Sequence, residues 1–333
     1  MRRTAVRIGI YATALAAALL FILATVAYDR YNRSGPLANP TVLIIGKGSS
    51  VARIADRLAR AGVIGNALLF RIGVRAEGID GALRAGEFEF PARVSMRQAA
   101  AILVSGETVK RRLTVAEGLT TAQVLALIAA TGGTEGQVAR PVAEGNLLPE
   151  TYFFSYGDTA GSLVARMEGA MREALDRAWR MRAEGLAVSS PRQALILASL
   201  IEKETGKPDE RARISAVFHN RLRRGMRLQT DPTVVYVLSG GKGPIDRPLT
   251  YDDLARPSPY NTYLNAGLPP GPIANPGLAS LAAAVNPAAV EDLYFVADGN
   301  GGHLFSRTLP EHNRNVARWR KMQRDRQSRP VTP

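Results

Sequence analysis

The 333-residue sequence contains no cysteine, only three histidines and only six lysines. The absence of cysteine excludes disulfides, thiol nucleophiles and thiolate zinc sites. His219, His303 and His312 are scattered and form no H-E-x-x-H run, which argues against a zinc peptidase. Neither a G-x-S-x-G nucleophile elbow nor a complete phosphate-binding P-loop occurs. The sequence therefore predicts neither a metal nor a cofactor.

Acidic residues are fewer than basic ones: 29 Asp and Glu residues stand against 43 Lys and Arg residues, which gives a formal net charge of +14. Most of this charge is arginine spread along the chain, apart from a basic stretch at residues 318–329. No helix-turn-helix, zinc-finger or RNA-recognition signature accompanies it, so we expect no nucleic-acid partner. A solvated arginine-rich surface is the simplest interpretation, and an anionic polymer or an anionic membrane surface is the alternative.

The longest uncharged segment covers residues 9–28, behind three arginines in the first seven residues. A helix of about 20 residues crosses the hydrocarbon layer of a bilayer, so this segment predicts a transmembrane anchor. A cleaved signal peptide is the alternative, but its apolar region is usually shorter. The positive flank places residues 1–8 in the cytoplasm. We therefore expect a single-pass protein of the plasma (inner) membrane, with its folded part extracytoplasmic or periplasmic.

Apolar residues make up 46% of the chain, enough for a buried core, and the length favours about two domains. Residues 29–40 are rich in turn formers and predict a linker to a first folded region, residues 41–110. There we expect strands at residues 41–45 and 87–90 and helices at residues 51–61 and 96–104. Residues 46–64 resemble the LysM module, a small β-α-α-β glycan-binding fold, with an ordinary α+β packing domain as the alternative.

Residues 111–325 predict a second domain that mixes helices and strands, and residues 326–333 a flexible tail. Residues 145–158 read as a loop. The remaining periodic segments predict strands at residues 111–115, 293–297 and 303–307 and helices at residues 121–130, 161–185 and 208–224. The last two strands face each other across a glycine-rich turn and predict a hairpin. The fold class is therefore α+β behind a single membrane helix.

Two carboxylates follow a helix that is apolar on almost every face. Ser190 and Pro191 form a helix start, residues 194–201 are apolar, and Glu202 and Glu204 come directly after them. Burial and the negative end of the helix dipole both favour the protonated form of a carboxyl group there. A protonated carboxyl near neutral pH is what general-acid catalysis requires, so Glu202 is the predicted catalytic residue.

Glu202 and Glu204 stand two positions apart and cannot face each other across a helix, so a paired-carboxylate site made from these two is not expected. The alternative is that both carboxylates only solvate the helix end, with Lys203 and Arg211 as partners.

Long segments around this helix resemble the YceG-like family, the endolytic murein transglycosylases, which are membrane-anchored enzymes that cut peptidoglycan glycan strands. The central segment is LASLIEKETGKPDERARISAVFHNRLRRGMRLQTDPTVVY, residues 197–236. Further segments with this resemblance are residues 145–154, 257–277, 283–288 and 293–313. The anchor, the LysM-like region and the later domain follow the order that the family has.

The resemblance implies the reaction and the role of one residue. The family's catalytic glutamate corresponds to Glu202. It would protonate the glycosidic oxygen between N-acetylmuramic acid and N-acetylglucosamine, then take the proton of the muramoyl C6 hydroxyl as that hydroxyl attacks C1. An ordinary glycosidase needs a second carboxylate. Here the intramolecular hydroxyl replaces it, and the product ends in a 1,6-anhydro sugar.

Polar and aromatic side chains near this helix are candidates for substrate binding, because tyrosine rings stack on sugars and amides both donate and accept hydrogen bonds. These candidates are Glu204, Gln229, Thr230, Asp231, Tyr260, Asn261 and Tyr263. Asp231 precedes a proline and could equally cap a helix at residues 233–238. The family also implies peptidoglycan synthases (penicillin-binding proteins) as partners. A non-catalytic, membrane-anchored glycan-binding scaffold is the alternative function.

Overall fold

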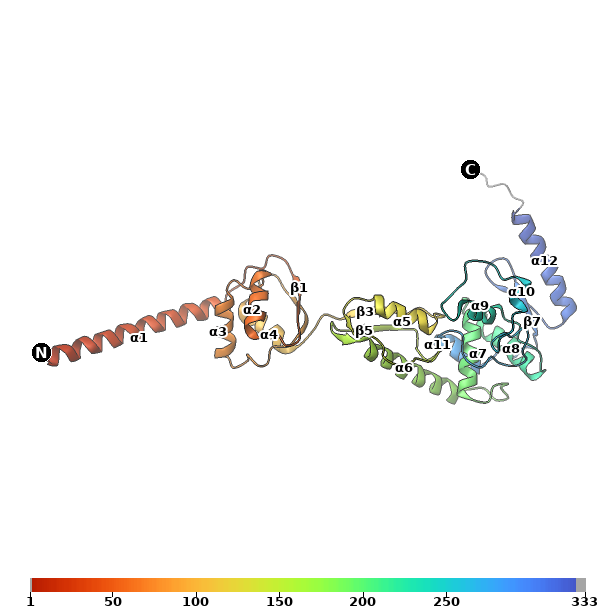
Figure 1. The fold of residues 1–333 in the computed structure, drawn as a ribbon, viewed down its shortest axis with the longest axis horizontal. Helices are drawn as coiled ribbons and strands as arrows, with labels where there is room; N and C mark the ends of the chain where they lie inside the picture. The colour runs from red at the N-terminus through yellow and green to blue at the C-terminus, as the bar shows by residue number, and fades with distance from the viewer. Residues whose placement is uncertain (1, 328–333) are drawn as a thin grey trace. The chain divides into compact units, whose positions relative to one another are not determined.

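The computed structural model describes residues 2–327 (Figure 1). The chain divides into two compact units, which are described separately. The first contains the residues up to Arg111 together with Phe153–Gly157. The second contains Arg112–Tyr152 and the residues from Asp158 onward. Helices and short strands occur in both, which confirms a mixed α and β protein.

Helix α1, Arg2–Asn32, carries the predicted membrane segment. Its part from Ile10 to Asn32 is long and apolar enough to cross a membrane. The helix runs past the predicted end at residue 28 because its last turn packs on the first unit: Tyr31 lies against Gly73 and its hydroxyl donates to Glu77 Oε2 at 3.3 Å. The orientation of the anchor in the membrane stays a prediction.

The first unit pairs two strands and packs three helices around one core. Strands β1, Thr41–Ile45, and β2, Gly86–Phe90, run antiparallel with Thr41 opposite Phe90. The helices are α2, Val51–Arg60, α3, Ala67–Ala76, and α4, Met96–Ser105. The fully buried core includes Phe70, Phe88, Phe90, Leu58 and Leu103. Strands β1 and β2 and helices α2 and α4 confirm the expected elements, whereas α3 was not predicted. The LysM-like assignment stays a prediction.

The second unit holds most of the helices. They are α5 Thr121–Ala130, α6 Ala160–Arg180, α7 Pro191–Glu204, α8 Arg211–Arg223, α9 Asp231–Ser239, α10 Tyr251–Leu254, α11 Leu278–Val285 and α12 Leu309–Gln327. Its strand pairs are β4 Thr134–Glu135 with β6 Asp158–Thr159 and β7 Tyr294–Ala297 with β8 His303–Ser306. Strand β3, Arg111–Thr114, pairs with β5, Thr151–Phe154, and the unit boundary passes through both strands. Among the pairs of this unit, β7 with β8 comes last in the chain. The last pair is the predicted hairpin, with Ala297 opposite His303.

Helix α7 is the centre of the second unit and packs against α6, α8, α9 and α11 (Figure 1). Its N-cap, Ser190, accepts a hydrogen bond from Gln193 N, and Pro191 occupies the first turn, as predicted. Every residue from Ala194 to Ile201 is buried. Burying one leucine or isoleucine side chain contributes about 1.5–3 kcal/mol, so this helix is firmly held. Glu202 and Glu204 lie in its last turn.

Several boundaries differ from the sequence prediction. The helix predicted at residues 161–185 is α6 and ends at Arg180, and the helix predicted at residues 208–224 is α8 and begins at Arg211. The predicted loop at residues 145–158 contains strand β5, because Tyr152 and Phe154 bury their rings there. Helix α9 begins at Asp231, not at residue 233, with Thr230 as its N-cap. Residues 318–327 of the basic C-terminal stretch belong to α12, which reaches Gln327, so residues 326 and 327 of the predicted tail are helical. Residues 328–333 of that tail lie outside the described residues.

Candidate active site

Glu202 projects from the last turn of α7 into a closed polar corner. Its side chain is only 5% exposed. Its Oε2 accepts a hydrogen bond from the backbone N–H of Gly277 at 2.9 Å, and its Oε1 lies 3.5 Å from Nη2 of Arg211. Gly277 is the N-cap of α11, and Arg211 is the first residue of α8. Three elements therefore meet at this carboxyl group.

A second carboxyl group, that of Glu117, completes the corner. Its Oε2 lies 3.7 Å from the same Nη2 atom of Arg211. Its Oε1 packs so tightly on Gly277 that a Cβ added there would lie 1.8 Å away. The Glu117 side chain is 45% exposed and forms the open edge of the pair. Partial burial, followed by the negative charge of Glu202, raises the pKa of Glu117, while Arg211 acts in the opposite direction.

The surroundings of Glu202 are more polar than the sequence predicted. We expected an apolar environment to favour the protonated carboxyl. Instead the buried guanidinium of Arg211 and the N–H of Gly277 contact it, and both stabilise a carboxylate. Within the described residues, Nε of Arg211 is buried without a hydrogen-bond partner, so this guanidinium is held mainly by its carboxylate contacts.

Backbone hydrogen bonds hold the segment that follows Glu117 against the segment that precedes α11. Gly118 N donates to Asn275 O at 3.0 Å, and Asn275 N donates to Leu119 O at 2.9 Å. Lys203 Nζ adds a bond to the carbonyl oxygen of Gly118 at 3.2 Å. The position of Glu117 relative to Glu202 is therefore set by main-chain pairing as well as by Arg211.

A pocket of about 270 Å³ opens beside this corner. Its lining includes Thr120, Gln123, Lys203, Asp231 and Tyr236, while Glu202 itself is not part of the lining. Lys203 follows Glu202 on α7, so the pocket and the carboxyl pair are neighbours along one helical turn. Of the predicted substrate-binding residues, Asp231 is the one that lines this pocket.

Glu204 belongs to a separate hydrogen-bond network. Thr230 Oγ1 donates to Glu204 Oε1, and Thr230 N donates to Thr262 Oγ1 at 3.0 Å. Burial raises the pKa of Glu204 to about 7, although the bond from Thr230 acts in the opposite direction. Gln229, which precedes this link, has a positive φ of 51° and is tied by its N–H to the carbonyl oxygen of Thr262. This network holds the loop that leads into α9.

Both aromatic candidates, Tyr260 and Tyr263, contact residues of α9. Tyr263 donates its hydroxyl to Asp231 Oδ1 at 2.5 Å, so Asp231 bonds to a tyrosine and does not cap the helix. Burial, together with this bond, raises the pKa of Tyr263. Tyr260 packs on Tyr236 with ring centroids 5.2 Å apart. The structure thus brings Asp231 and Tyr263 together and places Tyr260 beside a pocket-lining ring.

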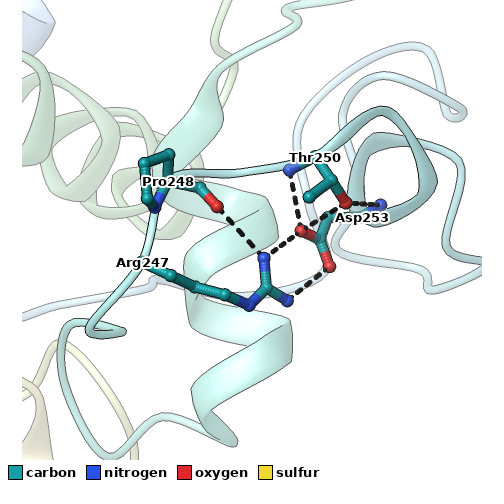
Figure 2. Close-up of polar contacts among 4 residues, drawn as sticks. All are labelled: Arg247, Pro248, Thr250 and Asp253. Carbon is teal, nitrogen blue, oxygen red and sulfur yellow. Dashed lines mark hydrogen bonds and ion pairs between the residues drawn. The ribbon is translucent and has the colours of Figure 1, made fainter.

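Asn261 is 1% exposed and acts inside its own loop. Its Nδ2 donates to the carbonyl oxygens of Leu254 and Arg256, each at 2.9 Å. Figure 2 shows a second set of contacts at α10, where Arg247 donates to both carboxylate oxygens of Asp253, at 2.5 and 2.9 Å.

Thr250 and Asp253 also form a capping box at the start of α10 (Figure 2). This short helix and Asn261 together fix the loop that carries the aromatic candidates.

Comparison with known proteins identifies the family. The model of the YceG-like family matches residues 43–318. The chain belongs to the YceG-like family. It is 34% identical over 301 residues to the endolytic murein transglycosylase of Bacillus subtilis (strain 168), a match that covers 81% of this chain and 82% of the relative.

Two further YceG-like relatives extend this comparison. The endolytic murein transglycosylase of Streptococcus pneumoniae (strain D39) is 29% identical over 320 residues, and the match spans 57% of that longer protein. A crystal structure of a YceG-like protein from Listeria monocytogenes aligns with a TM-score of 0.51 and 32% identity over 83% of this chain and 98% of that one. The fold of the family therefore extends over most of this chain.

Sequence reasoning did not single out Glu117, and it named Arg211 only as a surface partner. Glu117 stands far from Glu202 in the chain, next to the glycine of a turn. The signal that could have found it is its place between the end of β3 and the cap of α5, where a loop can carry functional side chains. The sequence gave no signal that Arg211 would be buried, since its burial depends on the packing of α8 in the folded protein.

Proposed function

We propose that this YceG-like chain is a membrane-anchored endolytic transglycosylase that cuts the β-1,4 bond between N-acetylmuramic acid and N-acetylglucosamine in nascent peptidoglycan strands. Membership of the family and the names of its relatives support the broader statement that the chain is a lytic murein transglycosylase. The observation that carries the finer proposal is the corner at Glu202, where a buried carboxyl group, a guanidinium and a backbone N–H converge beside a pocket.

In the proposed reaction Glu202 acts first as acid and then as base. Its proton passes to the glycosidic oxygen as the bond from that oxygen to C1 of the muramoyl residue breaks. The C6 hydroxyl of the same residue then attacks C1, and its proton returns to Glu202. The products are a 1,6-anhydromuramoyl end and a free 4-hydroxyl on N-acetylglucosamine. No water is consumed, and one carboxyl group handles both proton transfers.

The pocket beside the corner is the proposed binding site for a sugar next to the cleaved bond. Asp231 and Gln123 can bind hydroxyl or acetamido groups, and the Tyr236 ring offers an apolar face. The remaining candidates contribute by shaping this wall: Glu204, Gln229 and Thr230 through the loop before α9, and Tyr260, Asn261 and Tyr263 through the loop after α10.

The proposed location is the plasma membrane, with α1 as a single-pass anchor, a cytoplasmic N-terminus and the enzyme outside. The charge-free segment behind basic residues supports this orientation. An enzyme that cuts nascent strands works where they are polymerised, so peptidoglycan synthases are the proposed partners.

The test uses the full chain in detergent with uncrosslinked glycan strands, and mass spectrometry of the products. The parent protein should release fragments with anhydro ends. Glu202→Gln should lower this activity about 10²- to 10⁴-fold, the usual contribution of a general acid–base group, while the melting temperature stays close to that of the parent. Glu173→Gln, an exposed glutamate on α6, is the matched control and should keep full activity.

Two results would contradict the proposal. Activity retained by Glu202→Gln would remove the assigned role of this residue. An inactive parent that still binds glycan strands would favour the anchored scaffold, whose binding surface would then be sought in the strand–helix–helix–strand region of the first unit.

A further inference from the structure

Glu117 and Glu202 share one cation. Both carboxylates contact the same atom, Nη2 of Arg211, at 3.7 and 3.5 Å, and both also contact Gly277. Arg211 is 7% exposed, so its charge is screened little by water. An arginine keeps its proton at any ordinary pH, so this positive charge is permanent. Two acidic groups and one fixed cation therefore form a single electrostatic unit.

The proposed reaction requires a particular protonation state of Glu202 in this unit. Because Glu202 gives its proton away first and receives one back at the end, it must carry a proton at the start of every cycle. Next to Arg211 as the only charged neighbour, a carboxyl group would favour the ionised form. A second anion is required to balance the guanidinium, and Glu117 is the anion in contact with it.

We propose that Glu117 is a positioning residue of the active site, which together with Glu202 holds one proton between two carboxyl groups that share Arg211 as their counter-ion. This inference rests on the proposed function of Glu202. Glu117 acts through Arg211 and Glu202 and takes no part in bond cleavage. The Glu117 side chain is 45% exposed and that of Glu202 is 5% exposed, so Glu117 is the more accessible of the two carboxyl groups.

The electrostatics of the surroundings support a shared proton. Burial, followed by the negative charge of Glu202, raises the pKa of Glu117, so the two groups are electrostatically coupled. The other charged groups that face the pair are Glu150, which precedes β5, and Lys203 on α7. Helix α11, with the sequence LASLAAAV, contributes no charge to this corner.

The experiment is the pH dependence of strand cleavage by the full-length parent, Glu117→Gln and Glu117→Asp, with Glu173→Gln as the matched control. Glu117→Gln leaves Arg211 with Glu202 alone, so Glu202 loses its proton more easily. The pH at which activity falls on the alkaline side should therefore move to lower pH by about one unit or more. Glu117→Asp keeps the charge and should keep the parental profile.

A merely structural role predicts a different result. It would lower the rate by the same factor at every pH, or leave the profile unchanged, and either outcome overturns the inference. Full activity of Glu202→Gln together with loss of all activity in Glu117→Gln would show that the roles are reversed and would overturn it as well.

A double variant tests the pathway through the cation. If Glu117 acts by balancing the positive charge of Arg211, then adding Arg211→Met to Glu117→Gln should reverse the shift. The pH at which activity falls on the alkaline side should return to the parental value or above it. If the alkaline fall in activity stays at the lower pH in a folded double variant, Glu117 does not act through Arg211. If the double variant does not fold, the single Glu117→Gln profile decides, because this half-exposed side chain can be replaced without disturbing the core.

The outcomes separate this inference from the proposed function. An inactive parent, or an active Glu202→Gln, overturns both. An inactive Glu202→Gln beside an unchanged Glu117→Gln profile overturns the shared proton alone.

Discussion

Replacing Gly277 by alanine should disable the site while leaving the fold intact. The backbone of Gly277 has φ −80° and ψ 174°, which alanine adopts without strain. The new Cβ would lie 1.8 Å from Oε1 of Glu117 and 2.2 Å from its Cδ, so this carboxyl group must move by about 1 Å or more. Because its side chain is flexible and half exposed, Glu117 yields to the methyl group more readily than the backbone does.

Three small effects determine how Gly277→Ala changes the free energy of unfolding. Alanine at an N-cap position costs about 1 kcal/mol relative to a good cap. Replacing glycine stiffens the unfolded chain and returns roughly 0.4–1 kcal/mol. The partly exposed contact between Glu117 and Arg211 contributes at most about 1 kcal/mol. The net destabilisation is therefore at most about 1.6 kcal/mol, a fall in melting temperature of no more than roughly 3–6 °C.

Activity should respond much more strongly than stability. A misplacement of about 1 Å in a catalytic site can cost up to about 100-fold in rate, so we expect a 10- to 100-fold loss of strand cleavage at pH 7. The matched control is Gly206→Ala, just after α7, where an added Cβ meets nothing within 4 Å and the backbone φ is not positive. Parental activity in a folded Gly277→Ala variant would refute the assignment of Glu117 to the site.

Two further predictions concern stability. His219 is fully buried; its Nδ1 accepts a hydrogen bond from Ala187 N and its Nε2 bonds to Ala284 O. Burial lowers the pKa of His219. Its contribution to the free energy of unfolding is therefore complete above about pH 6.5 and is lost as the pH falls. The free energy of unfolding, measured with urea from pH 7 to pH 5, should fall less steeply in His219→Gln than in the parent; equal slopes would contradict this. Asp253, whose pKa is held well below its usual range by Arg247, should stabilise the protein above about pH 4. Asp253→Asn should melt below the parent at pH 7, with the gap narrowing from pH 4 to pH 2; a constant gap would show that the ion pair in Figure 2 is not the cause.

The elements with strong local signals could be predicted from the sequence. Ser50 and Ser95 each precede an amphipathic run, and each accepts the capping hydrogen bond at the start of its helix, α2 and α4. The start of α7 at Pro191 followed from the same reasoning. These signals act within one turn of chain, so one sequence is enough to find them.

Other elements depend on packing that the local pattern does not contain. Helix α3 exposes Leu68 and Ile72 while it buries Phe70 and Val74, so its apolar residues mark no single face. Helix α12 is charged around much of its surface and packs against β7 and β8. For such segments tertiary contacts decide the structure.

The residues of the candidate site also differ in whether local sequence or tertiary packing reveals them. Glu202 could be chosen because a carboxylate at the end of an apolar helix is unusual in itself. Arg211 was named from the sequence as a partner of the helix-end carboxylates, and it does contact Glu202. Glu117 could not be chosen, because its place beside Glu202 arises when the β3–α5 connection, α8 and α11 converge. The predicted apolar setting of Glu202 was wrong for the same reason: the buried cation comes from a different helix.

Three successive residues in the last turn of α7 each contact a different segment of the second unit. Glu202 contacts Gly277, Lys203 contacts Gly118, and Glu204 contacts Thr230. Unwinding of this single turn would release all three contacts together. The enzyme would then be switched off as a whole by a local event that leaves the buried part of the helix in place, and warming should silence it before the protein melts.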